Sequence, residues 1–268
     1  MKRVTLLDTS VCSLNAGDSI IMDAVRKELL DIIPNASYHA TFVHDKIGKS
    51  SRKLIKNSDL SFVGGTNILS SDMLRQKHWK IGMLEYFYLN DLILLGVGWG
   101  KYQQNPTWYT SKYLQKILSG KYLHSVRDSY SEDMLRRAGI TNVINTGCPT
   151  MWRLTKAHCK NIPTEKSKDV ILTLTDYRKS FDDDKKLIDI LARNYEKIYF
   201  WPQGVRDYGY ANDLSLFSKS NVEIINPNLQ SYDNLLNSGI KYDFVGTRLH
   251  GGIRALQKGH RAIIIGVD

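Results

Sequence analysis

Residues 244–252 read Phe-Val-Gly-Thr-Arg-Leu-His-Gly-Gly, and the pattern of this stretch recurs along the chain. Its apolar start, residues 244–246, is typical of a buried strand, and the periodicity of residues 250–258 predicts a helix. The turn between them carries Arg248 and His250. A strand that passes through such a turn into a helix is the repeating unit of a parallel α/β sheet.

Short apolar runs alternate with amphipathic stretches on both sides of this unit. Alternation of this kind favours β-α-β crossovers and parallel sheets. In the first half we expect strands at 2–7, 38–43, 59–63, 91–95, 122–126 and 142–145, with helices at 18–33, 49–56, 109–118 and 131–138. In the second half we expect strands at 170–174, 198–201, 222–225, 244–246 and 262–265, with helices at 182–195, 210–219, 230–238 and 250–258.

The alternation pauses over residues 153–168, a lysine-containing stretch without clear periodicity that suits a linker. We therefore expect an α/β protein of two doubly wound, Rossmann-like domains that face each other across a cleft. One domain would cover residues 1–152 and the other residues 165–268. Parallel sheets bind ligands at the carboxyl ends of their strands, so the residues that follow each strand are the candidates for function.

The composition is that of an ordinary globular protein, with 42% hydrophobic and 24% charged residues in a chain of 268. No apolar run approaches the ~20 residues of a membrane span. Asp8 interrupts the first apolar stretch, which is too short for a signal peptide, and we expect a cytoplasmic protein. The cysteines, Cys12, Cys148 and Cys159, form no C-x-x-C pair, so we expect reduced, half-buried thiols and no zinc site.

The net charge of +10 favours anionic partners. Lys49, Arg52, Lys53 and Lys56 share one face of a predicted helix, with no acid among them. This face is either a solvated surface or a contact with anionic lipid at the inner face of a membrane. No nucleic-acid-binding motif accompanies it, and we do not expect a nucleic-acid partner.

Two polar turns follow strands in the first half. Asn15, Gly17 and Asp18 lead into the first helix, whose N-terminus could bind an anion, although Asp18 also suits a simple helix cap. Gly64 and Gly65 follow the third strand and allow the backbone to approach a ligand or to make a tight turn. Thr66 continues this turn. The later Gly96-x-Gly98-x-Gly100 run lacks the spacing of a nucleotide-binding loop.

Two further turns carry arginine. Arg127 follows the strand at 122–126, between Ser125 and Asp128, and is placed to bind a carboxylate or phosphate unless Asp128 only begins a helix. In residues 247–252, Arg248 offers a fixed cation and His250 a group that titrates near neutrality. Thr247 and Gly251 complete the candidate site.

The order of these motifs resembles that of the polysaccharide pyruvyl transferase family. The resemblance rests on Asn15-x-Gly17-Asp18, Gly64-Gly65, Ser125-x-Arg127-Asp128, residues 146–150 and Arg248-Leu249-His250-Gly251, and it runs from about residue 9 to the end. It implies a two-domain fold similar to the GT-B glycosyltransferases. It also implies phosphoenolpyruvate as donor and a surface glycan or its lipid-linked precursor as acceptor.

This resemblance leads to a hypothesis of ketal-forming pyruvyl transfer, with the acceptor on the N-terminal domain and the donor on the C-terminal domain. Arg127 and Arg248 would hold the carboxylate and phosphate of the donor, and His250 would act as general acid. No metal or other cofactor is expected. The chain departs from the family pattern at Thr66, where a third glycine is common, and at Lys101, where a proline is common.

Three other functions remain open on the sequence. A glycosyltransferase of the same architecture would bind a nucleotide sugar, with the diphosphate at Arg248 and His250. A non-catalytic relative would bind glycan or lipid without releasing phosphate. A basic nucleic-acid binder would show strongly salt-dependent affinity.

Overall fold

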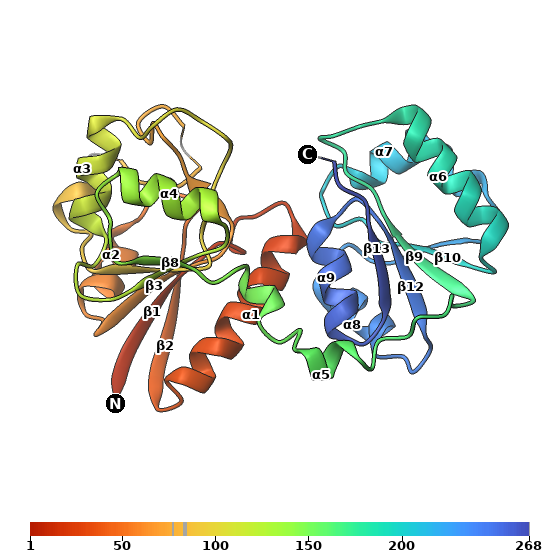
Figure 1. The fold of residues 1–268 in the computed structure, drawn as a ribbon, viewed down its shortest axis with the longest axis horizontal. Helices are drawn as coiled ribbons and strands as arrows, with labels where there is room; N and C mark the ends of the chain where they lie inside the picture. Colours follow the sequence, from red (N-terminus) through yellow and green to blue (C-terminus); the bar gives the residue numbers. More distant parts are fainter. Residues whose placement is uncertain (77, 83–84, 268) are drawn as a thin grey trace. The chain divides into compact units, whose positions relative to one another are not determined.

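The computed structural model describes residues 1–76, 78–82 and 85–267, which divide into two compact units. The N-terminal unit consists of residues 1–13 and 21–149, and the C-terminal unit of residues 14–20 and 150–268. The division falls within helix α1 (Ala16–Ile32), whose first residues group with the C-terminal unit. Figure 1 shows the elements of both units along the chain.

The N-terminal unit is built on a parallel sheet with the strand order β2-β1-β3-β5. Two small parallel pairs, β4 with β6 and β7 with β8, extend it. The strands are β1 (Lys2–Asp8), β2 (Ala36–Phe42), β3 (Leu60–Gly64), β4 (Asn67–Leu69), β5 (Leu92–Leu95), β6 (Gly98–Trp99), β7 (His124–Val126) and β8 (Val143–Asn145). The other helices are α2 (Lys49–Lys56), α3 (Trp108–Ile117) and α4 (Ser129–Arg137), with a short 3-10 turn η1 (Glu85–Phe87). A second 3-10 turn, η2 (Pro149–Met151), spans the point in the chain where the two units divide.

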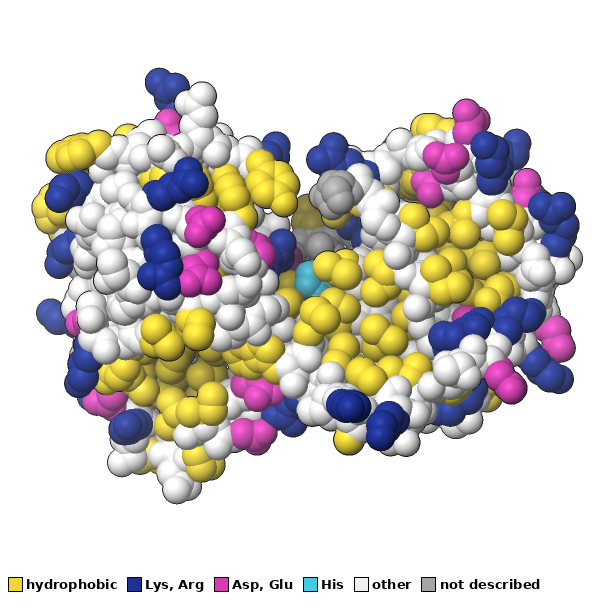
Figure 2. Space-filling model, viewed as in Figure 1, with side chains coloured by type: hydrophobic (Ala, Val, Ile, Leu, Met, Phe, Trp, Pro, Cys, Tyr) yellow, Lys and Arg dark blue, Asp and Glu magenta, His cyan; other side chains and the backbone are white. Residues whose placement is uncertain are grey.

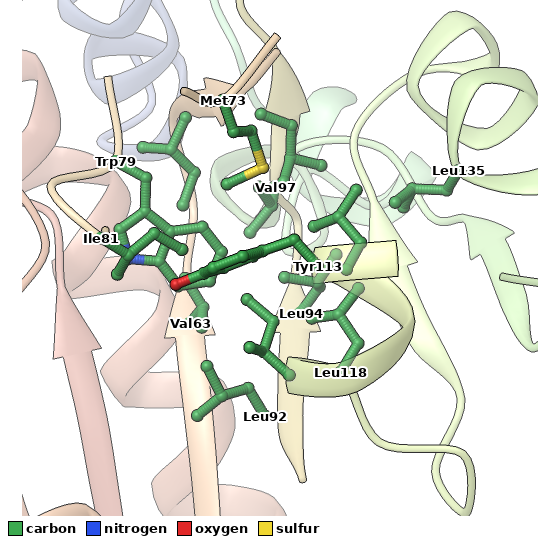
Figure 3. Close-up of a cluster of buried hydrophobic side chains, with 14 of the residues drawn as sticks. Val63, Met73, Trp79, Ile81, Leu92, Leu94, Val97, Tyr113, Leu118 and Leu135 are labelled. Carbon is green, nitrogen blue, oxygen red and sulfur yellow. The ribbon is translucent and has the colours of Figure 1, made fainter. Parts of the chain in front are cut away.

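Hydrophobic side chains cover both faces of this sheet. On one face α1 packs through Met22 and Val25 against Leu6 and its neighbours. On the other face α2, α3 and α4 pack against the opposite side chains of the strands. Figure 3 shows Tyr113 of α3 among these residues, with its ring beside Leu94 and its hydroxyl directed toward Ile81. Burial raises the pKa of this tyrosine, and its hydroxyl donates to the carbonyl of Gly82 at 2.9 Å.

The C-terminal unit is built on a second parallel sheet, with the strand order β11-β10-β9-β12-β13. The strands are β9 (Asp169–Thr173), β10 (Ile198–Phe200), β11 (Val222–Ile224), β12 (Tyr242–Gly246) and β13 (Arg261–Ile264). The helices are α5 (Lys156–Cys159), α6 (Phe181–Asn194), α7 (Asp207–Asp213), α8 (Leu229–Leu236) and α9 (Leu249–Gln257), with a 3-10 turn η3 (Leu216–Ser218).

This sheet also has apolar side chains on both faces. Helices α6 and α7 pack against Val170 and Leu172 on one face. Helices α8 and α9, together with Ile20 of α1, pack against Ile171 and Phe244 on the other. The edge strand β13 leaves Ile263 50% exposed, and Figure 2 shows hydrophobic side chains gathered on the visible face of this unit.

The expected α/β class with parallel sheets is confirmed, and most elements lie within a few residues of their predicted bounds. The stretch at 153–168, which we expected to suit a linker, contains the short helix α5, and β6, which the sequence did not predict, follows β5 and pairs with β4. One helix prediction was wrong in its bounds. The helix predicted at 210–219 is α7, which ends at Asp213 because Ser215 adopts a left-handed conformation (φ 57°) before η3.

Two further expectations concern the state of the cysteine thiols and the presence of helices that could span a membrane. Within the described residues Cys12, Cys148 and Cys159 form no disulfide, and Cys12 and Cys159 are exposed rather than half-buried as expected. Across residues 1–76, 78–82 and 85–267, none of the helices combines the length and the apolar character that a bilayer span requires.

Candidate active site

The C-terminal sheet reverses its direction of strand addition between β9 and β12. In an open parallel sheet, ligands bind beside such a switch point, outside the carboxyl ends of the strands. The segments that leave the sheet there are Leu174–Tyr177 after β9 and Thr247–His250 after β12. Arg248 and His250 therefore emerge where the topology places a ligand site.

Arg248 is buried, with its side chain 4% exposed. Its Nε donates to Oδ2 of Asp207 at 2.9 Å and to the carbonyl of Leu174 at 3.1 Å, and its Nη2 donates to Oδ1 of Asp176 at 3.0 Å and to Oδ1 of Asp207. The Tyr177 ring lies 4.9 Å from the guanidinium carbon. These contacts fix the guanidinium and compensate its charge.

The two carboxylates on Arg248 also have other partners. Arg206 Nε lies 3.1 Å from Oδ2 of Asp176, so two arginines face two aspartates here. Burial raises the pKa of the Asp207 carboxyl, and hydrogen bonds from Arg248 and from the backbone N–H groups of Gly204 and Asp176 oppose that rise. The sequence predicted a fixed cation at Arg248, and the structure adds that its charge is balanced by Asp207 and Asp176.

Gly204 makes this arrangement sterically possible. A Cβ on Gly204 would overlap Nη2 of Arg248. The backbone N–H of Gly204 donates to Oδ2 of Asp207 at 2.7 Å. The turn after β10 therefore leaves space for the Arg248 guanidinium and donates a hydrogen bond to the Asp207 carboxylate.

His250 lies in the first turn of α9 and is half-buried. Arg248 is the N-cap residue of this helix, and within the described part of the chain its side chain does not cap the helix. A helix start with uncapped N–H groups attracts anions. Thr247, also buried, donates through Oγ1 to Thr175 at 2.8 Å, and Gly251 packs closely on Phe244.

The turn that begins α1 lies against the turn after β10. Asn15 Oδ1 accepts hydrogen bonds from the Gly17 N–H and from Gln203 Nε2, both at 3.0 Å. The Ala16 N–H donates to the Gln203 carbonyl at 2.9 Å. The structure thus brings Asn15 and Gly17 together with the turn after β10, and Asp18 lies almost buried in the first turn of α1.

The N-terminal sheet has its own switch point, between β1 and β3. Gly64, Gly65 and Thr66 follow β3 there, as predicted. A Cβ on Gly64 would lie 2.8 Å from Met22, and one on Gly65 (φ 55°) would overlap Ile21, so both glycines allow α1 to approach. Thr66 is left-handed as well (φ 51°), which costs a non-glycine residue free energy.

Arg127 lies near a second cluster in the N-terminal unit. Its Nε is 3.6 Å from Oδ2 of Asp128, a longer and more exposed contact than those of Arg248. A Cβ on Gly98 would lie 2.5 Å from Arg127 Nε and would overlap Asn67 Oδ1. Asn67 Oδ1 is buried and has no hydrogen-bond partner among the described residues. The Arg127 guanidinium is therefore held less tightly by neighbouring protein groups than the Arg248 guanidinium.

The neighbours of Arg127 have structural roles. Ser125 Oγ lies 2.5 Å from Thr146 Oγ1 and accepts the Gly96 N–H at 3.0 Å. Asp128 caps α4, with Oδ1 accepting the Ser131 N–H at 2.7 Å. Both side chains hold the loop that carries Arg127.

Sequence reasoning missed four of these residues as functional candidates. Asp176 and Tyr177 follow β9, and Gln203 and Asp207 follow β10. The carboxyl-end position was therefore the available signal. No group of metal-ligating side chains occurs within the described ranges, which omit residues 77, 83, 84 and 268.

The basic face of α2 differs from its sequence pattern at one position. Lys49, Lys53 and Lys56 are exposed, but Arg52 turns inward, 3.8 Å from Glu85 Oε1 and 4.2 Å over the Tyr88 ring. Figure 2 shows lysine and arginine side chains along the edge of this unit where Figure 1 labels α2 and α3.

A family model described as polysaccharide pyruvyl transferase matches residues 15–268, nearly the whole chain. A search of curated proteins found no match. The matched range begins at Asn15 and contains every candidate site residue.

Proposed function

This chain belongs to the polysaccharide pyruvyl transferase family and is a transferase, and we propose that its donor is phosphoenolpyruvate. Its acceptor would be a sugar of a surface polysaccharide or of the lipid-linked precursor. The product would be a pyruvate ketal that bridges two hydroxyls of that sugar. The observation that carries this proposal is the family match over a range that contains both arginine turns and His250.

The proposed reaction balances without a redox step. A proton adds to the methylene carbon C3 of phosphoenolpyruvate, and the adjacent C2 becomes oxocarbenium-like. One sugar hydroxyl forms a C–O bond to C2 and loses its proton. A second hydroxyl then attacks C2, the C–O bond to phosphate breaks, and phosphate leaves with the remaining proton.

His250 is our candidate for the group that protonates C3. It lies in the first turn of α9, where helix N–H groups favour a bound anion. A positioned general acid contributes about 10²- to 10⁴-fold to such a step. The same imidazole would then be placed to assist the departing phosphate.

Arg127 and Arg248 would contribute unequally to binding of the donor. Arg248 is held by Asp207 and Asp176, so its remaining electrostatic attraction for an anion is reduced. Arg127 makes a longer contact with Asp128, at 3.6 Å, and is 24% exposed. We therefore assign Arg127 the larger part of donor affinity and Arg248 the fixed geometry.

We further propose a GT-B-like arrangement in which the two units face each other across the substrate cleft. The C-terminal unit would hold the donor beside Arg248 and His250, and the N-terminal unit would supply Arg127 to that donor together with most of the contacts to the acceptor. In this arrangement the carboxyl ends of the strands at both switch points, between β9 and β12 and between β1 and β3, would face the same substrates. Small-angle scattering with and without phosphoenolpyruvate tests this arrangement, because a ligand-bridged cleft should reduce the radius of gyration.

Contact with an anionic membrane is a separate proposal. Lys49, Lys53 and Lys56 are exposed on α2, and a cavity of ≈ 390 Å³ beside this helix is lined in part by Arg3 and His39. Each lysine near an anionic surface contributes about 1 kcal/mol. Changing all three lysines to Glu should abolish sedimentation with phosphatidylserine vesicles at low salt. The same change at Lys156, Lys160 and Lys168 is the control, and equal loss in both variants would contradict a local contact.

The reaction itself is tested by phosphorus NMR of phosphoenolpyruvate with the protein and a panel of methyl hexopyranosides. The proposal predicts inorganic phosphate only when a sugar is present, together with a ketal product. Phosphate release that ignores the sugar, or sugar nucleotides as the only substrates consumed, would contradict it.

A further inference from the structure

Gln203 carries a buried polar atom that no protein group satisfies. The residue is 5% exposed, and its Oε1 has no hydrogen-bond partner within the described parts of the chain. Most buried side-chain polar atoms in proteins are paired, because an unpaired one costs free energy. An isolated acceptor at the edge of a candidate site is therefore a feature that a ligand can complete.

The orientation of the Gln203 amide follows from its surroundings. Asn15 must present an oxygen to the Gly17 N–H, 3.0 Å away. That same oxygen lies 3.0 Å from the Gln203 amide, which must therefore present its nitrogen. A flipped Gln203 would place two oxygens against each other. Its Oε1 is thus directed to the other side.

The other side is the start of α9. A Cβ on Gly251 would lie 3.1 Å from Gln203 Oε1, tighter than most real contacts. Gly251 follows His250 directly in the chain. The unpaired acceptor therefore borders the turn that carries the proposed general acid.

The backbone around Gln203 is fixed on several sides. Its carbonyl accepts the Ala16 N–H at 2.9 Å, and the Val205 N–H donates to the Leu14 carbonyl at 3.1 Å. Trp201 stacks on Tyr232, with ring centroids 4.0 Å apart. Oε1 is thus held in place before any ligand arrives, which lowers the entropy cost of binding.

We propose that Gln203 Oε1 accepts a hydrogen bond from a hydroxyl of the sugar acceptor and holds that sugar beside His250. The inference rests on the proposed function and names a contact within it. A carboxylate and an ionised phosphate are acceptors, so phosphoenolpyruvate has no donor for this atom at neutral pH. A sugar hydroxyl has one. Gln203 is therefore an acceptor-binding residue, and the C-terminal unit contacts both substrates.

The test compares wild type with Gln203→Met, which keeps the length of the side chain and removes Oε1. Saturation-transfer NMR measures binding of methyl galactopyranoside, methyl glucopyranoside and methyl mannopyranoside, and calorimetry measures phosphoenolpyruvate. We expect at least one sugar to bind wild type and to bind the variant about 5- to 100-fold more weakly. Phosphoenolpyruvate affinity should stay within about twofold. Gln230→Met, an exposed site on α8, is the matched control and should change neither.

Gly251→Ala provides a second variant, because Gln203→Met also removes the bond to Asn15. Its methyl group would crowd Oε1 without touching that bond, and sugar binding should weaken again. Sugar binding equal to wild type in a folded Gln203→Met protein, or no sugar bound by wild type, would overturn the inference. Failure of the wild-type protein to bind phosphoenolpyruvate would instead contradict the proposed donor. The sugar-binding measurement would still test the role of Gln203.

Discussion

Arg248 and Asp207 form a two-point ion pair inside the C-terminal unit, with Nε donating to Oδ2 and Nη2 donating to Oδ1. The two side chains are 4% and 0% exposed. When one partner of such a buried pair is removed, the other charge stays in the interior without compensation. Arg248 is therefore required for the fold of the candidate site.

Arg248→Ala should lower the free energy of unfolding by about 3–5 kcal/mol, because Asp207 would be left buried and unpaired. Arg127→Ala should change it by less than about 1 kcal/mol, since the contact of Arg127 with Asp128 is long and partly exposed. Urea unfolding of both variants measures the difference. Equal losses of unfolding free energy in the two variants would show that Arg127 contributes as much to the stability of the fold as Arg248.

Gly204→Ala should destabilise the protein by about 1–3 kcal/mol, because the new methyl group would displace Nη2 of Arg248. Gly209→Ala is the control. Gly209 is exposed within α7 and has nothing within 4 Å of a Cβ, so alanine there should stabilise the helix by up to about 1 kcal/mol. Thermal melts of both variants compare them, and a Gly204→Ala protein as stable as wild type would contradict the packing argument.

His250→Ala should keep phosphoenolpyruvate affinity within a few-fold and lower turnover by about 10²- to 10⁴-fold, because protonation of C3 loses its acid. Calorimetry and sugar-dependent phosphate release measure the two effects. His158→Ala is a control in the same unit, since His158 contacts the Leu256 carbonyl at the far end of α9. Wild-type turnover in His250→Ala would remove this residue from the mechanism.

Two buried histidines predict how stability depends on pH. Burial lowers the pKa of His124 and of His260, and in each the Nδ1 accepts a backbone N–H. The unfolded side chains have pKa values near 6.5, so below about pH 6.5 the unfolded chain binds more protons than the folded one. The free energy of unfolding should fall as the pH drops through this window and should not change for this reason above it.

Urea unfolding at about pH 7.5 and about pH 5.5 measures this dependence. His124→Gln should show a weaker dependence than wild type, whereas His39→Gln, at an exposed position, should keep it. Identical free energies of unfolding at the two pH values would show that these imidazoles are not held neutral by the fold.

The sequence predicted elements best where local signals agree. Helix α2 was predicted at 49–56 and has those bounds, because its amphipathic period lies between Gly48 and Asn57. The pairing of β4 with β6 was missed, since each strand is very short and their contact joins distant parts of the chain. Helix α7 begins earlier than predicted, at Asp207, the residue that also binds Arg248.

In the candidate site too, the positions of residues along the chain could be predicted, whereas contacts between distant residues could not. The position of Arg248 after a strand could be read from the sequence, but its partners could not, because Asp176 and Asp207 reach it only through the fold of the sheet. Asp128 caps α4, as the sequence allowed, and ligand binding by the neighbouring Arg127 stays a prediction. Residues 14–20 include the start of α1, yet the hydrogen bonds of this segment to Gln203 and Val205 group it with the C-terminal unit.

The most direct test of the account is a calorimetric titration of phosphoenolpyruvate into wild type and Arg127→Ala, with a nucleoside diphosphate as the competing ligand. We predict saturable binding to wild type and an affinity at least about tenfold weaker in a fully folded Arg127→Ala, the loss of one charge-assisted contact. Binding of the nucleoside diphosphate but not of phosphoenolpyruvate, or equal phosphoenolpyruvate affinity in both proteins, would contradict the account.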